Sequence, residues 1–68
     1  MNDNFASISF LRLDVVMLKT GLARSTVYKL MSLGDFPLPV KLTGKSIAWA
    51  SNEIDFWISN RLNARTQS

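Results

Sequence analysis

Few residues of this sequence could carry out catalysis. Residues 44–46 read Gly-Lys-Ser, the end of a phosphate-binding P-loop, but that motif needs glycine five positions before the first of them, where this chain has Pro39. The chain contains no histidine and no cysteine, so the commonest general base, the usual metal ligands and a thiol nucleophile are missing. Glu53 and Asp55 are two residues apart in an expected helix, and side chains at that spacing point in different directions. We therefore expect a protein that is not an enzyme and needs no metal or cofactor.

A different chemistry is indicated by the hydrogen-bonding side chains of residues 24–32. At 100° per residue in a helix, four of them share one face, with Arg24 at its edge: Ser25, Tyr28, Lys29 and Ser32. No acid occurs between Asp14 and Asp35, whereas an ordinary surface helix usually pairs Glu with Lys. In a DNA major groove, Arg24 or Lys29 would reach guanine acceptors, and Ser25 or Tyr28 would contact a phosphate or a base edge.

The charge distribution supports a polyanionic partner. The formal net charge is +3, but residues 19–50 alone carry five cations and one acid, a net +4. The five cations are Lys19, Arg24, Lys29, Lys41 and Lys45. If about five cations contact phosphates, the logarithm of the binding constant should fall with the logarithm of salt concentration with a slope of about −4 to −5. The alternative is that these lysines only keep the surface soluble.

The elements that would position these side chains are two short helices. One helix is predicted by the spacing i, i+3, i+4 and i+7, which puts Leu13, Val16, Met17 and Thr20 on one stripe, and Gly21 ends it. Val27, Leu30 and Met31 form the apolar stripe of a second helix, which Gly34 ends. Two helices joined by a short turn containing glycine are typical of a helix-turn-helix.

A connector and a hairpin follow. Residues 34–39 include two prolines and predict a rigid, non-helical connector. Residues 40–49 predict a hairpin about a two-residue Gly44-Lys45 turn of type II′. That turn puts Val40 opposite Trp49 and Leu42 opposite Ile47, so four apolar side chains share one face. The other face carries polar residues, and two cations lie on the hairpin: Lys41 on that face and Lys45 at the tip.

The remaining segments complete the expected fold. Ser51 is a good N-cap for a third helix with Ile54, Trp57, Ile58 and Leu62 as its apolar stripe. We expect a flexible leader at residues 1–7, one domain at 8–62 and a flexible tail at 63–68, with a short strand within 7–11. The fold class is mainly α with a small β-hairpin: a winged helix-turn-helix of three helices and a two-stranded wing. No membrane span or signal peptide is evident, so we expect a cytoplasmic protein associated with the nucleoid.

Two other functions fit parts of the pattern. The first is binding of a single strand, whose bases could stack on four aromatic residues: Phe36, Trp49, Phe56 and Trp57. Core packing is favoured for these residues, because both tryptophans lie on predicted apolar faces. The polar helix face could instead bind a protein partner, with no role for nucleic acid. A salt-independent affinity would favour that alternative.

Four successive motifs resemble the AlpA family of short prophage regulators: residues 10–13, 20–28, 36–42 and 48–49. The resemblance runs from about Phe10 to Leu62, with the motifs in the family's order and spacing. The family is similar in fold to phage excisionases and to the DNA-binding domain of MerR-type regulators. It implies a protein that binds double-stranded DNA, either as a prophage transcription regulator, often of an integrase gene, or as an excisionase-like factor that bends DNA for recombination.

Residue by residue, the resemblance places two sets of side chains at the DNA. Arg24, Ser25, Thr26, Tyr28 and Lys29 would lie in or beside the recognition helix, and Lys41, Gly44 and Lys45 in the wing. One position departs from the family pattern: Ala23 stands where Ser or Thr would cap the recognition helix, at an expected cost of about 1 kcal/mol. We expect a monomer in solution, with copies side by side on repeated DNA sites.

Overall fold

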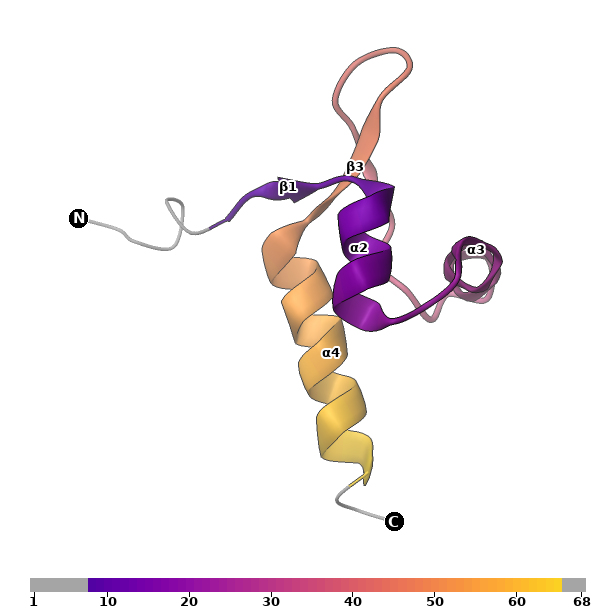
Figure 1. Ribbon diagram of the computed structural model, residues 1–68, viewed down its shortest axis with the longest axis vertical. Helices are drawn as coiled ribbons and strands as arrows, with labels where there is room; N and C mark the ends of the chain where they lie inside the picture. Colours follow the sequence, from indigo (N-terminus) through magenta and orange to yellow (C-terminus); the bar gives the residue numbers. More distant parts are fainter. Residues whose placement is uncertain (1–7, 66–68) are drawn as a thin grey trace, which may run out of the picture.

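A computed structural model describes residues 8–65 of the 68-residue chain. Along the chain the elements are β1 (Phe10–Leu11), α2 (Leu13–Thr20), α3 (Arg24–Ser32), β2 (Val40–Lys41), β3 (Ile47–Ala50) and α4 (Ser51–Arg65). The arrangement is the predicted one, mainly α with a small antiparallel hairpin, and is a winged helix-turn-helix (Figure 1). Among residues 8–65, none of the helices has the length and apolar character needed to cross a bilayer.

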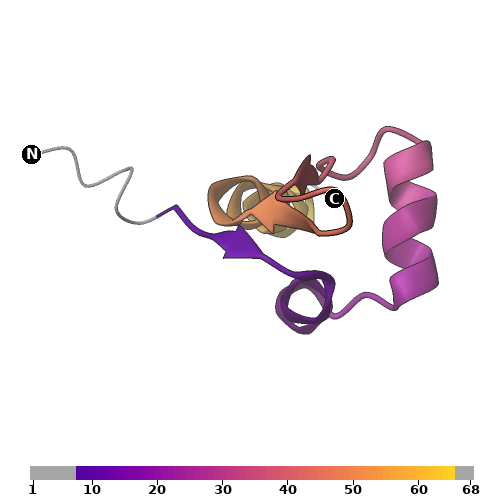
Figure 2. The ribbon, with the colours of Figure 1, turned by 90° about the horizontal axis from the view of Figure 1, so that it is seen from above.

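The helix-turn-helix has the predicted boundaries. α2 ends at Gly21, whose φ of 76° is left-handed and whose amide donates to the Met17 carbonyl oxygen at 2.8 Å. The Thr20 hydroxyl donates to the carbonyl of Val16 and accepts from the amide of Leu22, so it helps to shape the turn. Three residues then lead into α3, which runs across α2 rather than along it (Figures 1 and 2).

The sheet has three strands in the order β1-β3-β2, one more than the predicted wing. Phe10 pairs with Ala50 and Leu11 with Trp49, so the short strand expected within residues 7–11 becomes an edge of the sheet. The Ser9 amide also donates to the Ser51 hydroxyl oxygen, and the Ser51 amide donates to the Ser9 carbonyl, both at 2.8 Å. These bonds tie β1 to the start of α4.

The predicted register of the hairpin is wrong by one residue. Val40 pairs with Ala48 rather than Trp49, and Lys41 pairs with Ile47. The Leu42 amide donates to the Ser46 carbonyl, so the loop holds three residues instead of the predicted Gly44-Lys45 pair. Positive φ among the described residues occurs only at Gly21 and Gly34, so Gly44 lacks the positive φ that a type II′ turn requires.

The shifted register redistributes the side chains between the two faces of the hairpin, because neighbours along a strand point to opposite sides. Val40 and Leu42, both predicted to pack inward, are 41% and 39% exposed. Trp49 remains fully buried. The alternating apolar pattern favoured the register that puts Val40, Leu42, Ile47 and Trp49 on one face, but the three-residue loop of the structure gives the register shifted by one.

The core receives one side chain from each main segment. It is a single cluster of Val16, Val27, Phe36, Trp49 and Ile54. These come from α2, α3, the connector between α3 and β2, β3 and α4, respectively. Ala48 of β3 is also fully buried. Since a core this small has few members, each of them is important for holding the fold together.

α4 is longer than the sequence predicted. It continues to Arg65, so residues 63–65, assigned above to a flexible tail, are helical. Leu62, expected in the apolar stripe, is 50% exposed, while Ile54 is fully buried and Trp57 and Ile58 are half-buried. The leader predicted at residues 1–7 and the last three residues of the predicted tail lie outside the described residues.

Candidate nucleic-acid interface

The polar face of α3 is open to solvent. Figure 2 shows the helix along its length at the margin of the molecule, with the other elements to one side of it. Val27 is fully buried, and Leu30 and Met31 are half-buried, so the predicted apolar stripe is the side that packs. Five of the six predicted site residues of this helix are exposed and Thr26 is half-buried: Arg24, Ser25, Tyr28, Lys29 and Ser32.

The start of α3 has no side-chain cap. Ala23 has the extended backbone of an N-cap residue, with φ −75° and ψ 160°, but makes no side-chain hydrogen bond to the helix. The first turn also contains no acid. The first amide groups of α3 and the positive end of its dipole are therefore not compensated by a carboxylate within the helix, and Arg24 adds a full positive charge beside them.

One side chain of the polar face is partly used inside the helix. The Ser32 hydroxyl donates to the Lys29 carbonyl oxygen at 2.7 Å. Its proton is therefore engaged, and the oxygen keeps only its acceptor capacity. Since an acceptor does not bind a phosphate oxygen, Ser32 is the weakest member of the predicted set.

The hairpin, residues 40–50, hereafter the wing, presents Lys41 and Lys45 to solvent. The corrected register changes the side on which Lys41 lies. It is the cross-strand partner of Ile47, and Ile47 and Trp49 are on the sheet face that packs on the core. Lys41 therefore lies on the same face of the sheet as Ile47, rather than on the opposite face as predicted.

The structure separates Lys19 from the other central cations. Its ammonium group lies 2.7 Å from the Asp55 carboxylate, in an ion pair between α2 and α4. The four remaining cations are exposed, and none of them forms an ion pair with another of residues 8–65: Arg24, Lys29, Lys41 and Lys45. Of the five central cations at residues 19–50, four rather than five are therefore available to an anionic ligand.

The described residues contain no group of three or more metal-ligating side chains. The proposed stacking platform is also not assembled, because Phe36 and Trp49 are buried in the core. What α3 and the wing offer is a convex, cationic, hydrogen-bonding surface, which suits a polyanion with a groove and does not enclose a small molecule.

Two hydrogen bonds near this surface were not anticipated from the sequence. The Trp49 indole N–H donates to the Pro37 carbonyl at 2.9 Å, and the Trp57 indole N–H donates to the Asp35 carbonyl at 2.7 Å. Both acceptors are in the connector that follows α3. The sequence contained one general signal, since the N–H of a buried tryptophan needs an acceptor, but it did not indicate which carbonyl.

Comparison with known proteins identifies relatives over most of the chain. The family described as "Prophage CP4-57 regulatory protein (AlpA)" matches residues 9–62. The chain is 45% identical over 56 residues to "Uncharacterized protein ORF88" of Enterobacteria phage P4, covering 82% of this chain and 64% of the phage protein. It is 37% identical over 65 residues to "DNA-binding transcriptional activator AlpA" of Escherichia coli K12, covering 87% of this chain and 93% of that protein.

Proposed function

This chain belongs to the AlpA family of prophage regulatory proteins, and on that premise we propose that it binds double-stranded DNA in a sequence-specific manner. The observation that carries the proposal is the charge of α3 and the wing: four exposed cations without ion-pair partners among residues 8–65, and an exposed helix face without acids. An α-helix with its side chains is about 10–12 Å across, which matches the width of the major groove.

In the proposed complex α3 is the recognition helix. Arg24 and Lys29 reach the acceptors of guanine, and Ser25 and Tyr28 contact phosphates or base edges. Thr26, at the edge of the exposed face, and Ser32, through its oxygen, have minor parts. A phosphate near the start of α3 would also interact with the uncapped amides of its first turn.

The wing contacts the DNA beside this helix. Lys41 and Lys45 lie against the flanking phosphate backbone or in the adjacent minor groove, where their charge contributes affinity without selecting a base. The unit that binds is residues 8–62, as a monomer in solution, with copies side by side where the DNA repeats its site.

The biological role we propose is regulation of transcription in a prophage or integrated element. The E. coli relative named above is a DNA-binding transcriptional activator, and the gene we expect this chain to control encodes an integrase or an excision function. An excisionase-like role, in which the protein bends DNA for recombination, would use the same groove contacts. Mapping of bound sites across the host genome separates the two roles, because a site lies either at a promoter or within an attachment site.

The proposal is tested by titrating a labelled duplex at several salt concentrations. Four cations predict a slope of about −3 to −4 for the logarithm of the binding constant against that of salt concentration, smaller than expected when Lys19 was included. Lys45→Ala should reduce the magnitude of the slope by about one. Lys19→Ala is the matched control and should leave it unchanged, because this cation already pairs with Asp55.

A binding constant that does not depend on salt would contradict the proposal. It would favour the alternative in which the polar face of α3 binds a protein.

A further inference from the structure

Residues 33–39 connect the proposed recognition helix to the wing, and their path begins with a well-defined helix end. The Gly34 amide donates to the Met31 carbonyl at 3.1 Å, and the Asp35 amide donates to the Leu30 carbonyl at 2.9 Å. With Gly34 at φ 77°, this is a Schellman motif. The motif ends α3 and defines the direction in which the chain leaves the helix.

Beyond the helix end, two indoles from different elements hold the connector. Trp57 of α4 donates to the Asp35 carbonyl, and Trp49 of β3 donates to the Pro37 carbonyl. Between these two carbonyls lies Phe36, which is only 6% exposed. Three consecutive residues of the connector are therefore anchored to two elements that do not include α3.

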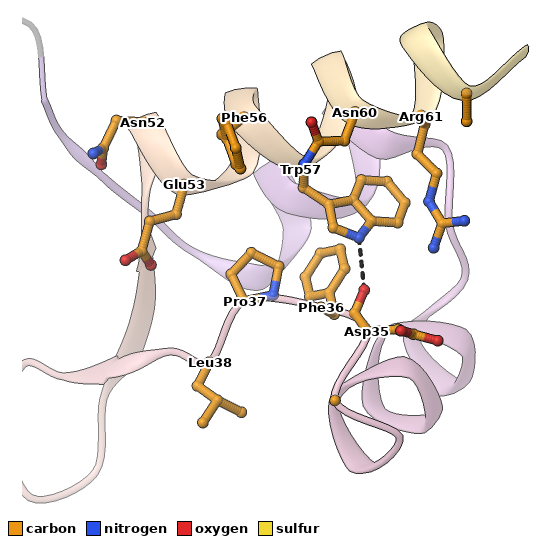
Figure 3. Close-up of a pocket in the computed structure, with 12 residues that line it drawn as sticks. Asp35, Phe36, Pro37, Leu38, Asn52, Glu53, Phe56, Trp57, Asn60 and Arg61 are labelled. Carbon is orange, nitrogen blue, oxygen red and sulfur yellow. Dashed lines mark hydrogen bonds between the residues drawn. The ribbon is translucent and has the colours of Figure 1, made fainter. Parts of the chain in front are cut away.

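Figure 3 shows the contacts between α4 and this segment. The Phe36 ring meets the Trp57 ring edge to face, with centroids 5.0 Å apart. The Arg61 guanidinium lies 4.6 Å from the centroid of the Trp57 ring, so the indole is held between a cation and an aromatic ring. Pro37 restricts the backbone at the next position. The indole and the connector are thus joined both by a hydrogen bond, which lies at the surface, and by ring packing.

α3 needs such a restraint because it lies at the margin of the molecule (Figure 2) and contributes one buried residue, Val27, to the core. At its start, α3 also lacks a side-chain cap. A helix and a wing that must contact DNA together lose affinity when their relative orientation has to be fixed on binding.

We infer that the Trp57 indole N–H is a positioning group: its hydrogen bond to the Asp35 carbonyl sets the orientation of α3 relative to the wing. The inference rests on the proposed function for its effect on DNA. Trp57 touches no nucleic acid in this arrangement. It acts through the connector, so its loss reduces discrimination between DNA sequences more than it reduces charge-driven binding.

Trp57 allows a cleaner test than Trp49, which is fully buried and serves the core as well. In Trp57→Phe the ring remains but the N–H donor is removed. Phe56→Ala is the matched control, since Phe56 neighbours Trp57 in the same groove and is 68% exposed. If Trp57→Phe fails to fold, chemical synthesis of the 68-residue chain with 3-benzothienylalanine at position 57 removes the N–H while keeping the shape of the indole.

The first measurement is the ratio of affinities for two duplexes: one selected by the wild-type protein from a randomised pool, and a scrambled one of equal length. The loss of the donor should lower this ratio about three- to tenfold, the range expected for one hydrogen bond, with affinity for the scrambled duplex unchanged. Phe56→Ala should keep the wild-type ratio. An unchanged ratio in the variant that lacks the donor overturns the inference.

The second measurement needs no DNA. Backbone residual dipolar couplings report whether α3 keeps one orientation relative to α4 and the sheet. In the wild-type protein one alignment tensor should fit all elements, and in the variant the couplings of α3 should depart from it. Couplings that still fit overturn the positioning role even if the affinity ratio has fallen. If instead the wild-type protein binds no duplex, the proposed function fails and these couplings alone decide the inference.

Discussion

α3 and α4 each bury one side against the same core, yet their exposed sides differ in charge. The exposed side of α3 carries Arg24 and Lys29 with no acid among its nine residues. The exposed side of α4 carries both signs, with one carboxylate, Asp55, in an ion pair to α2 and Arg61 over the Trp57 ring. A surface that only has to stay in water can compensate its charges within the molecule. The surface of α3 does not, which is the arrangement expected when the counter-charges come from a ligand.

The largest effect should come from the core that both helices share. Trp49→Ala removes a fully buried side chain and the hydrogen bond to Pro37. A buried tryptophan replaced by alanine costs about 3–5 kcal/mol, which is comparable with the whole stability of a domain this small. The variant should show no cooperative thermal transition by far-UV circular dichroism. A cooperatively folded variant would mean that α3 and α4 do not depend on this common core.

The next effect tests the difference between the helices directly. Arg24→Ala combined with Lys29→Ala should lower affinity for a selected duplex about 30-fold or more, since each of the two base contacts contributes about 1–3 kcal/mol and 1.4 kcal/mol is a factor of about ten. Circular dichroism should not change, because both side chains are exposed.

Arg61→Ala is the control from α4, where the cation lies over an aromatic ring rather than in the proposed interface. It should reduce affinity much less than the α3 pair. Equal losses from the two helices would remove the distinction between their surfaces.

The smallest effect concerns how the two helices begin. α4 starts at Ser51, whose hydroxyl oxygen accepts a hydrogen bond from the Ser9 amide, whereas Ala23 before α3 has cap geometry without a capping atom. Ala23→Ser should stabilise the domain by about 1 kcal/mol, a rise of roughly 4–8 °C in Tm for a domain of this size.

Ala23→Val supplies no acceptor and should give no such gain, which makes it the matched control for that measurement. An unchanged Tm in Ala23→Ser would mean that the missing cap at the start of α3 does not reduce the stability of the domain.

The sequence by itself determined the local features. Apolar periodicity and the glycines at 21 and 34 were sufficient for the two helices of the helix-turn-helix, because helix hydrogen bonds join residues four apart and both glycines have the positive φ expected of helix ends. The exposure of the α3 face and the missing cap at Ala23 follow from the same short-range geometry. Seven of the eight predicted site residues are exposed and Thr26 is half-buried, although their contacts with DNA remain a prediction.

Only the tertiary structure decided the features that join distant segments. The hairpin register depended on a three-residue loop with no glycine of positive φ, and its shift by one residue changed the side on which Lys41 lies. Three other features each join residues 12 or more apart in the sequence. They are the ion pair between Lys19 and Asp55, the pairing of the third strand, and the choice of the Asp35 and Pro37 carbonyls as indole acceptors. Such partners are selected by how the elements pack in space, and a periodic pattern within one element contains no information about which element lies beside it.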